Sequence, residues 1–227
     1  MFFDPTYILV IIGAVICMVA SGNVNSTYNK YSRVQSSAGM TGAMAATRLL
    51  NYVGIYDVRV EHISGNLTDH YDPSSKVLRL SDSVYNATSV AAIGVAAHEC
   101  GHAIQHAKGY VPLQIRTAIV PVVNIGSTLS WPMIILGVIL GWNRTLIQIG
   151  ILLFTAVVVF QLVTLPVEFN ASSRALTLLE ESGILYHEEM KQSRKVLTAA
   201  ALTYVAAAAS SILQLLRLLL LFGRRDD

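Results

Sequence analysis

Two histidines and a glutamate, His98, Glu99 and His102, have the spacing of a catalytic metal site. Residues four apart lie on the same face of an α-helix, so both imidazoles can bind one metal ion. Glu99 lies about 100° around the helix from His98, from where its carboxylate can reach a metal-bound water without being a ligand. This H-E-x-x-H pattern predicts one zinc ion per chain and Glu99 as the general base of peptide-bond hydrolysis.

The residues around this triplet indicate a buried helix. Residues 89–96 before it are small and apolar. Thr88 or Ser89 is a suitable N-cap, and Gly109 lies near the expected end. A buried helix that carries histidine and glutamate needs partners for them. Two solvent-facing histidines are the alternative, which the surrounding Ala, Gly, Val and Ile residues disfavour.

The composition predicts an integral membrane protein. Hydrophobic residues make up 53% and charged residues 13% of the 227 residues, and the mean hydropathy is +0.53, well outside the soluble range. A net charge of +2 is too small to suggest nucleic-acid binding. Cys17 lies in the first apolar run and Cys100 in the His98 helix, so neither a disulfide nor an oxidising compartment is indicated.

Apolar runs of membrane-spanning length divide the chain. Residues 23–116 hold half of the basic residues, so the positive-inside rule predicts a multi-pass protein of the cell membrane with this segment in the cytoplasm. A fourth crossing near the C-terminus is weakly favoured over an Ala-rich helix packed on the core. The predicted segments are an N-terminal membrane anchor (1–22), a metallopeptidase core with the His98 helix (23–116), a transmembrane hairpin (117–165), a second part of the core (166–195) and a C-terminal Ala- and Leu-rich helix (196–227).

The polar core segment predicts a small α+β domain. Residues 37–52 are expected to form a helix that ends at Gly54, and residues 58–63 and 76–80 alternate like half-buried strands of a small antiparallel sheet. An exposed edge at residues 76–80 would bind an extended peptide as an added strand. The predicted fold is a mainly α integral membrane protein with three to four transmembrane helices and a cytoplasmic zincin-like catalytic domain of the gluzincin type.

A third zinc ligand is expected from the segment that follows the hairpin. Pro166 suits the first turn of a helix, and Glu168 is the carboxylate that the hairpin returns to the membrane face where His98 and His102 lie. Ala171 and Ser172 continue the face of Glu168 with small side chains that allow close helix packing. A carboxylate that stabilises a helix N-terminus is the alternative role for Glu168.

Other polar residues are weaker candidates for the site. His187, Tyr186 and Arg174 could each stabilise the oxyanion, and the sequence does not rank them. His62 and His70 could add a ligand but are more typical of partly exposed strand or turn residues. His106 lies about 12 Å along the helix from His98, too far to share the metal.

Five blocks of the sequence occur in a defined order, at residues 56–61, 67–73, 78–81, 97–105 and 166–172. Together they resemble the bacterial YugP-type neutral zinc metallopeptidases. The resemblance covers most of the chain and implies a membrane-embedded zinc peptidase. More remotely, the layout is similar to HtpX-type and CAAX-processing peptidases, in which a Glu-x-x-x-Asp segment supplies the third ligand. Glu168 matches that Glu, whereas Ser172 stands at the Asp position, so Asn170, Ser172 or another group must orient the ligand histidines.

Two other functions are compatible with parts of the sequence. A membrane binding or scaffold protein could hold a structural metal, but such a site does not require Glu99. A transporter could line a path with Asn124, Gln148 and Gln161, which are uncharged and scattered. The expected partners are therefore a protein or peptide substrate and the lipid bilayer. The sequence does not identify an oligomer or a regulatory membrane partner.

Overall fold

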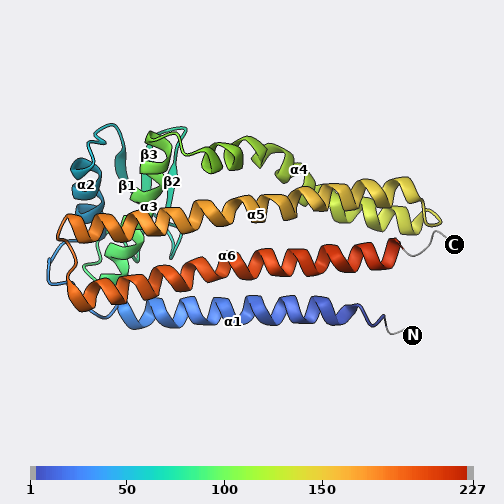
Figure 1. Cartoon of the computed structure of the whole chain (residues 1–227), viewed down its shortest axis with the longest axis horizontal. Helices are drawn as coiled ribbons and strands as arrows, with labels where there is room; N and C mark the ends of the chain where they lie inside the picture. Colours follow the sequence, from blue (N-terminus) through green and yellow to red (C-terminus); the bar gives the residue numbers. More distant parts are fainter. Residues whose placement is uncertain (1–3, 224–227) are drawn as a thin grey trace. The chain divides into compact units, whose positions relative to one another are not determined.

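The computed structural model describes residues 4–223, and within this range the chain forms helices and three short strands (Figure 1). Contacts group the chain into two compact units. Unit 1 comprises Met1–Ser21, Gln114–Leu165 and Thr203–Asp227, and unit 2 comprises Gly22–Leu113 and Pro166–Leu202. The elements are α1 (Tyr7–Tyr31), α2 (Gly42–Tyr52), β1 (Arg59–Ile63), β2 (His70–Asp72), β3 (Val77–Ser81), α3 (Val90–Ala107), α4 (Val111–Ile139), α5 (Arg144–Glu181) and α6 (His187–Phe222).

Four helices, α1, α4, α5 and α6, are long and apolar enough to cross a membrane. The chain therefore has the fourth candidate span that the sequence only weakly favoured. Residues 1–3 of the predicted anchor and residues 224–227 of the predicted C-terminal helix lie outside the described residues.

Small residues bring the helices of unit 1 together. A Cβ atom at Gly13 in α1 would lie 2.7 Å from the hydroxyl of Ser210 in α6, and one at Gly150 in α5 would lie 2.8 Å from the carbonyl oxygen of Ser130 in α4. Lipid supplies little hydrophobic force between helices, so close backbone packing of this kind is how they associate.

The membrane hairpin differs from the prediction at both ends. Helix α4 begins at Val111, before the apolar run, and contains Pro121 and Pro132. The tight link before Arg144 is confirmed, with Gly141 and Trp142 at φ values of +73° and +65°. The predicted helix start at Pro166 is wrong, because α5 continues through this proline. Proline is tolerated inside such helices because neighbouring groups satisfy the freed backbone carbonyl.

The sheet of unit 2 has the order β1-β3-β2 and corrects the antiparallel prediction. Strand β1 pairs parallel to β3, with Arg59 opposite Val77, and β2 pairs antiparallel to β3, with His70 opposite Arg79. The predicted substrate edge at residues 76–80 is also wrong, because β3 is the central strand and has a neighbour on both sides. Alternation reveals which face of a strand is buried but not the direction of its partner.

Helices α2 and α3 build the core of unit 2 over this sheet. Helix α2 begins at Gly42, later than predicted, because the hydroxyl of Thr41 accepts a hydrogen bond from the amide of Met44 at 3.2 Å and caps the helix. Of the two predicted caps of α3, Ser89 takes the role and bonds the amide of Ala92. Buried alanine, leucine and isoleucine side chains of α2, β3, α3 and α5 form one apolar cluster.

Candidate metal centre

Helix α3 approaches α5 closely enough to align side chains from both helices. A Cβ atom at Gly101 would lie 2.4 Å from the carbonyl oxygen of Ala171, so only glycine fits at this contact. Ala171 and Ala175 are buried, and the small-residue face predicted for this segment lies inside unit 2. The contact sets Glu168 and Ser172 of α5 against the histidines of α3.

The structure brings His98, His102 and Glu168 together. Nε2 of His98 lies 3.2 Å and Nε2 of His102 lies 3.6 Å from the same carboxylate oxygen of Glu168. One donor atom from each residue lies within 4.8 Å of the other two. Glu168 is 2% exposed and His102 9%, so the cluster is largely shielded from water.

This geometry fits a divalent metal ion such as zinc. Two atoms bound at ~2.1 Å to one tetrahedral zinc ion lie about 3.4 Å apart, which matches the separations between Glu168 and the two imidazoles. Two histidines and one glutamate also form a usual ligand set of catalytic zinc, which leaves one position open. A buried carboxylate is stabilised by a neighbouring positive charge, which a bound metal ion would supply.

The other nitrogen of each imidazole has its own partner. Nδ1 of His98 lies 3.1 Å from the hydroxyl of Ser172, and Nδ1 of His102 lies 3.1 Å from Oε1 of Gln105. Of the predicted candidates for this role, Ser172 contacts an imidazole directly, whereas Asn170 reaches His102 only through Gln105. Gln105 was not among the predicted groups, and its position three residues after His102 on the same helix is the signal in the sequence that indicates it. Both Nε2 atoms are therefore left to face the metal position.

A chain of hydrogen bonds fixes the proton on His102. The guanidinium of Arg174 can only donate, and its Nε bonds Oδ1 of Asn170 at 2.7 Å. That oxygen also accepts from Nε2 of Gln105 at 3.0 Å, so Oε1 of Gln105 faces His102 as an acceptor. Nδ1 of His102 must then donate, and its Nε2 carries the lone pair that a metal ion needs.

Glu99 is buried on the same helix, at 7% exposure. Within residues 4–223 its carboxylate has no hydrogen-bond or salt-bridge partner. Burial alone would lower the pKa of His102, but the neighbouring carboxylates of Glu168 and Glu99 outweigh burial and raise it.

The remaining candidates lie elsewhere in unit 2, except Arg174. The exposed residues Tyr186 and His187 follow the end of α5 at Glu181, about 20 Å along that helix from Glu168. The structure therefore does not bring these two residues to the three-residue cluster. Arg174 is joined to His102 through Asn170 and Gln105.

The other histidines have separate partners. Nε2 of His62 lies 2.6 Å from Oδ1 of Asp82, and Nδ1 of His70 lies 2.9 Å from the carbonyl oxygen of Thr68. His106 contacts the hydroxyl of Tyr71 in β2 at 2.8 Å. None of the three belongs to the His98, His102 and Glu168 cluster.

Fold and site define a protein with four candidate membrane helices and a buried cluster of two histidines and a glutamate able to bind a metal. The chain belongs to the family described as "Putative neutral zinc metallopeptidase", which it matches over residues 6–223. It is 49% identical over 203 residues to a Bacillus subtilis (strain 168) protein named "Putative membrane protease YugP", with 89% of this chain and 90% of the relative covered. No solved structure matches the chain.

Proposed function

We propose that the chain is a membrane-embedded zinc-dependent endopeptidase. One zinc ion would be held by His98, His102 and Glu168, with Glu99 as the general base. The observation that supports this most directly is the buried three-residue cluster whose Nε2 atoms face Glu168 while both Nδ1 atoms are hydrogen-bonded. Residues 23–116 and 166–195 would form the zincin-like catalytic domain, which corresponds closely to unit 2.

The proposed chemistry divides between the ion and the side chains. When bound, zinc would polarise the scissile carbonyl and lower the pKa of a coordinated water toward 7. Glu99 would take a proton from the attacking water and deliver it to the leaving amine. Ser172 and Gln105 would fix the orientation of the two imidazoles through their hydrogen bonds to Nδ1.

An extended peptide would bind along β2. This strand is at an edge of the sheet. The hydroxyl of Tyr71 in β2 is hydrogen-bonded to His106, which lies one helical turn beyond His102 on α3. Backbone groups on the free side of β2 can pair with an added strand. The substrate class would therefore be unfolded or loop-like protein segments near the membrane surface.

We place unit 2 on the cytoplasmic side, because residues 23–116 carry half of the basic residues. Tyr56 is 79% exposed in unit 2 and provides a test. In a Tyr56→Cys variant, a membrane-impermeant maleimide should label the new thiol in opened but not in intact cells. Labelling of the new thiol in intact cells would show that unit 2 lies on the outer side of the membrane.

The central test compares wild type with Glu99→Gln in one detergent, measuring zinc content and cleavage of casein and of membrane-protein segments. Glu61→Gln is the matched control, since Glu61 is a partly exposed glutamate of β1 that pairs with Arg59. Wild type and both variants should bind one zinc ion, and only Glu99→Gln should lose cleavage.

The same measurements separate the peptidase from a scaffold with a structural metal. Structural zinc sites have four protein ligands, whereas the described residues supply three here. Zinc binding without cleavage of any substrate by wild type would favour the scaffold. Wild type without bound metal would refute both.

A further inference from the structure

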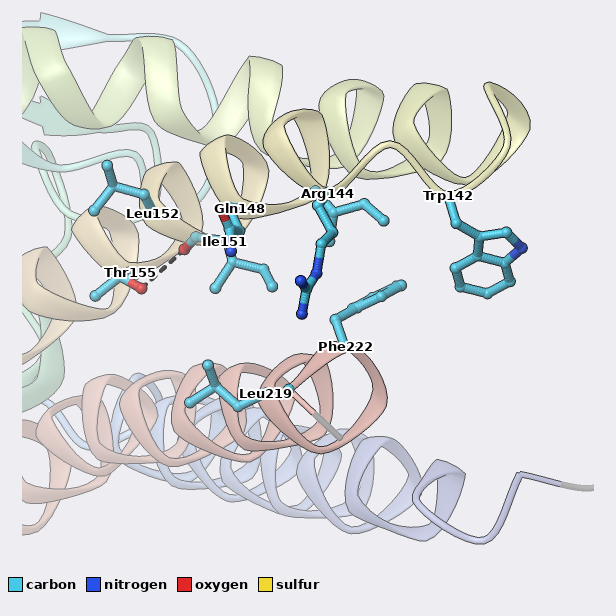
Figure 2. A pocket seen from close by; sticks show the side chains of 10 residues that line it. Trp142, Arg144, Gln148, Ile151, Leu152, Thr155, Leu219 and Phe222 are labelled. Atoms are coloured by element: carbon cyan, nitrogen blue, oxygen red, sulfur yellow. Dashed lines mark hydrogen bonds between the residues drawn. The ribbon is translucent and has the colours of Figure 1, made fainter. Parts of the chain in front are cut away.

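Two pockets outside the metal cluster differ in what lies beside them. The pocket in unit 1 lies between α5 and α6 (Figure 2), and its exposed Leu152 and Leu219 side chains suit contact with the bilayer itself. A groove in unit 2, with a volume of about 530 Å³, lies instead beside strand β1. Its lining includes Met40, Met44, Arg48 and Asn51 on the side of α2, Val60 of β1, and Tyr85.

We propose that this groove and the free edge of β1 bind an extended segment of the polypeptide substrate, away from the bond that is cut. The proposal rests on the peptidase function proposed above. It adds a second contact for the substrate, on the opposite edge of the sheet from β2.

Strand β1 has an unpaired edge. It lies at one side of the sheet and pairs parallel to β3. The amide of Arg59 donates to the carbonyl oxygen of Lys76, just before β3, at 3.1 Å. Because backbone groups alternate in direction along a strand, those of Val60 and His62 point away from β3. Within the described chain, the outward N–H and C=O groups of these two residues have no partner.

The burial pattern agrees that β1 is uncovered within residues 4–223. Every residue of β1 is at least partly exposed, whereas four of the five residues of β3 are buried. Val60 and Tyr85 pack against the apolar core from outside, so the groove begins where this core ends. Met44 of α2 is 57% exposed on the groove. An added strand would therefore find hydrogen-bonding groups in β1 and apolar side chains beside them.

The groove lies where side chains of an added strand would project. Val60 is paired with the fully buried Leu78, so both side chains lie on the face of the sheet that packs against the helices. Every second side chain of a strand beside β1 would point to the same face, next to Val60 and toward Met44. Methionine is flexible and adapts to different apolar side chains, which suits a site for varied unfolded sequences.

The small size of this surface favours a transient occupant. Val60 and His62 supply two outward N–H and two outward C=O groups, and eight residues line the groove. A stable protein interface usually involves about 20–30 residues on each side. A permanent partner or a second copy of the chain is therefore disfavoured, whereas an unfolded substrate that is held only until it is cut fits this size.

Photo-crosslinking tests the location. The probe is a peptide of alternating threonine and leucine with one photo-leucine at its centre, and the protein is Glu99→Gln in detergent, so that the peptide is not cleaved. Mass spectrometry should place the crosslinks in residues 40–51 and at Val60. A fully N-methylated form of the peptide keeps the side chains but cannot pair with a strand, so its crosslinking should fall about ten-fold.

Variants of the edge and the groove separate the two contributions. Val60→Pro removes an outward N–H that makes no bond to β3, which edge strands tolerate, and it should weaken the crosslinking. Met44→Ala should raise the KM for casein about four-fold, the effect of one buried methylene group, with kcat unchanged. Tyr56→Ala is the control, because Tyr56 is 79% exposed and outside the groove, and it should change neither quantity. Circular dichroism equal to that of wild type shows that each variant is folded.

Four results would overturn the proposal. Crosslinks confined to β2 or α3 would mean that the peptide binds only near the metal cluster, and equal crosslinking of the N-methylated peptide would mean that no strand pairing occurs. An unchanged KM for casein in Met44→Ala would show that the groove does not hold the substrate. A dimer that Val60→Pro dissociates would assign the edge to a second copy. Absence of casein cleavage by wild type would instead refute the peptidase function, and crosslinks in residues 40–51 would then assign the edge to a peptide other than a substrate.

Discussion

Replacing Gln105 by leucine should weaken metal binding without touching a ligand. Gln105 is fully buried and accepts from Nδ1 of His102, while its Nε2 donates to the carbonyl oxygen of Val167 at 2.8 Å and to Asn170 at 3.0 Å. Leucine has a similar size but no acceptor, so the Nδ1 proton of His102 would lose its partner.

Two separate considerations give the same magnitude for Gln105→Leu. A buried donor without an acceptor costs about 1–3 kcal/mol. Loss of the group that orients a ligand histidine usually lowers metal affinity about 10- to 100-fold, which is ~1.4–2.7 kcal/mol. We therefore expect the dissociation constant of zinc to rise 10- to 100-fold.

Competition with a zinc chelator at pH 7.5 measures this change in the dissociation constant. Gln192→Leu is the matched control in unit 2, because Oε1 of Gln192 is buried without a hydrogen-bond partner. The control should bind zinc like wild type. An affinity of Gln105→Leu within two-fold of wild type would refute the role assigned to the Gln105 amide.

Three further predictions concern packing, ligand orientation and pH. Gly101→Ala should lower the free energy of unfolding by about 1–3 kcal/mol, because the new methyl group would collide with the backbone of α5. Gly22 has open space around it, so Gly22→Ala should leave this free energy unchanged, and denaturant titration compares the two variants. Ser172→Asp should tighten zinc binding in the same chelator assay, because a carboxylate is a stronger acceptor for Nδ1 of His98 than a hydroxyl, and a weaker affinity would contradict this. Hydrogen bonds from Ser74 and Ser75 hold the pKa of Asp72 below its ordinary value. The ionised carboxylate therefore stabilises the fold above its unfolded pKa of ~3.9, and this stabilisation is lost as the pH falls through its folded pKa. In Asp72→Asn, the free energy of unfolding should consequently fall less steeply between pH 5 and pH 2 than in wild type.

Local rules predicted the parts of the site that depend on one helix. The spacing of His98 and His102 is enough to place both imidazoles on one face, and the cap at Ser89 follows from residue type. The position of Glu168 beside them follows from the hairpin between the two segments. The catalytic roles of these residues stay predictions.

The sheet and the hydrogen-bonded network around His102 could not be predicted from such local rules. Strand β2 is three residues long and lies among turn-forming residues, so its sequence does not separate it from a loop. Gln105 acts through Asn170 and Arg174 of another helix, and a single sequence contains no record of that contact. The rule that places proline in the first turn describes soluble helices, whereas α5 is a candidate membrane helix and continues through Pro166.

The order of the proposed ligands along the chain has a consequence for biosynthesis. His98 and Glu168 are 70 residues apart, and α4 together with the apolar part of α5 lies between them. At about 5–20 residues per second, the ribosome completes this interval in about 4–14 s. If these residues bind the metal as proposed, the nascent chain has an incomplete ligand set until the hairpin has been synthesised. The complete site would therefore arise only on a chain that already carries α4 and the apolar part of α5.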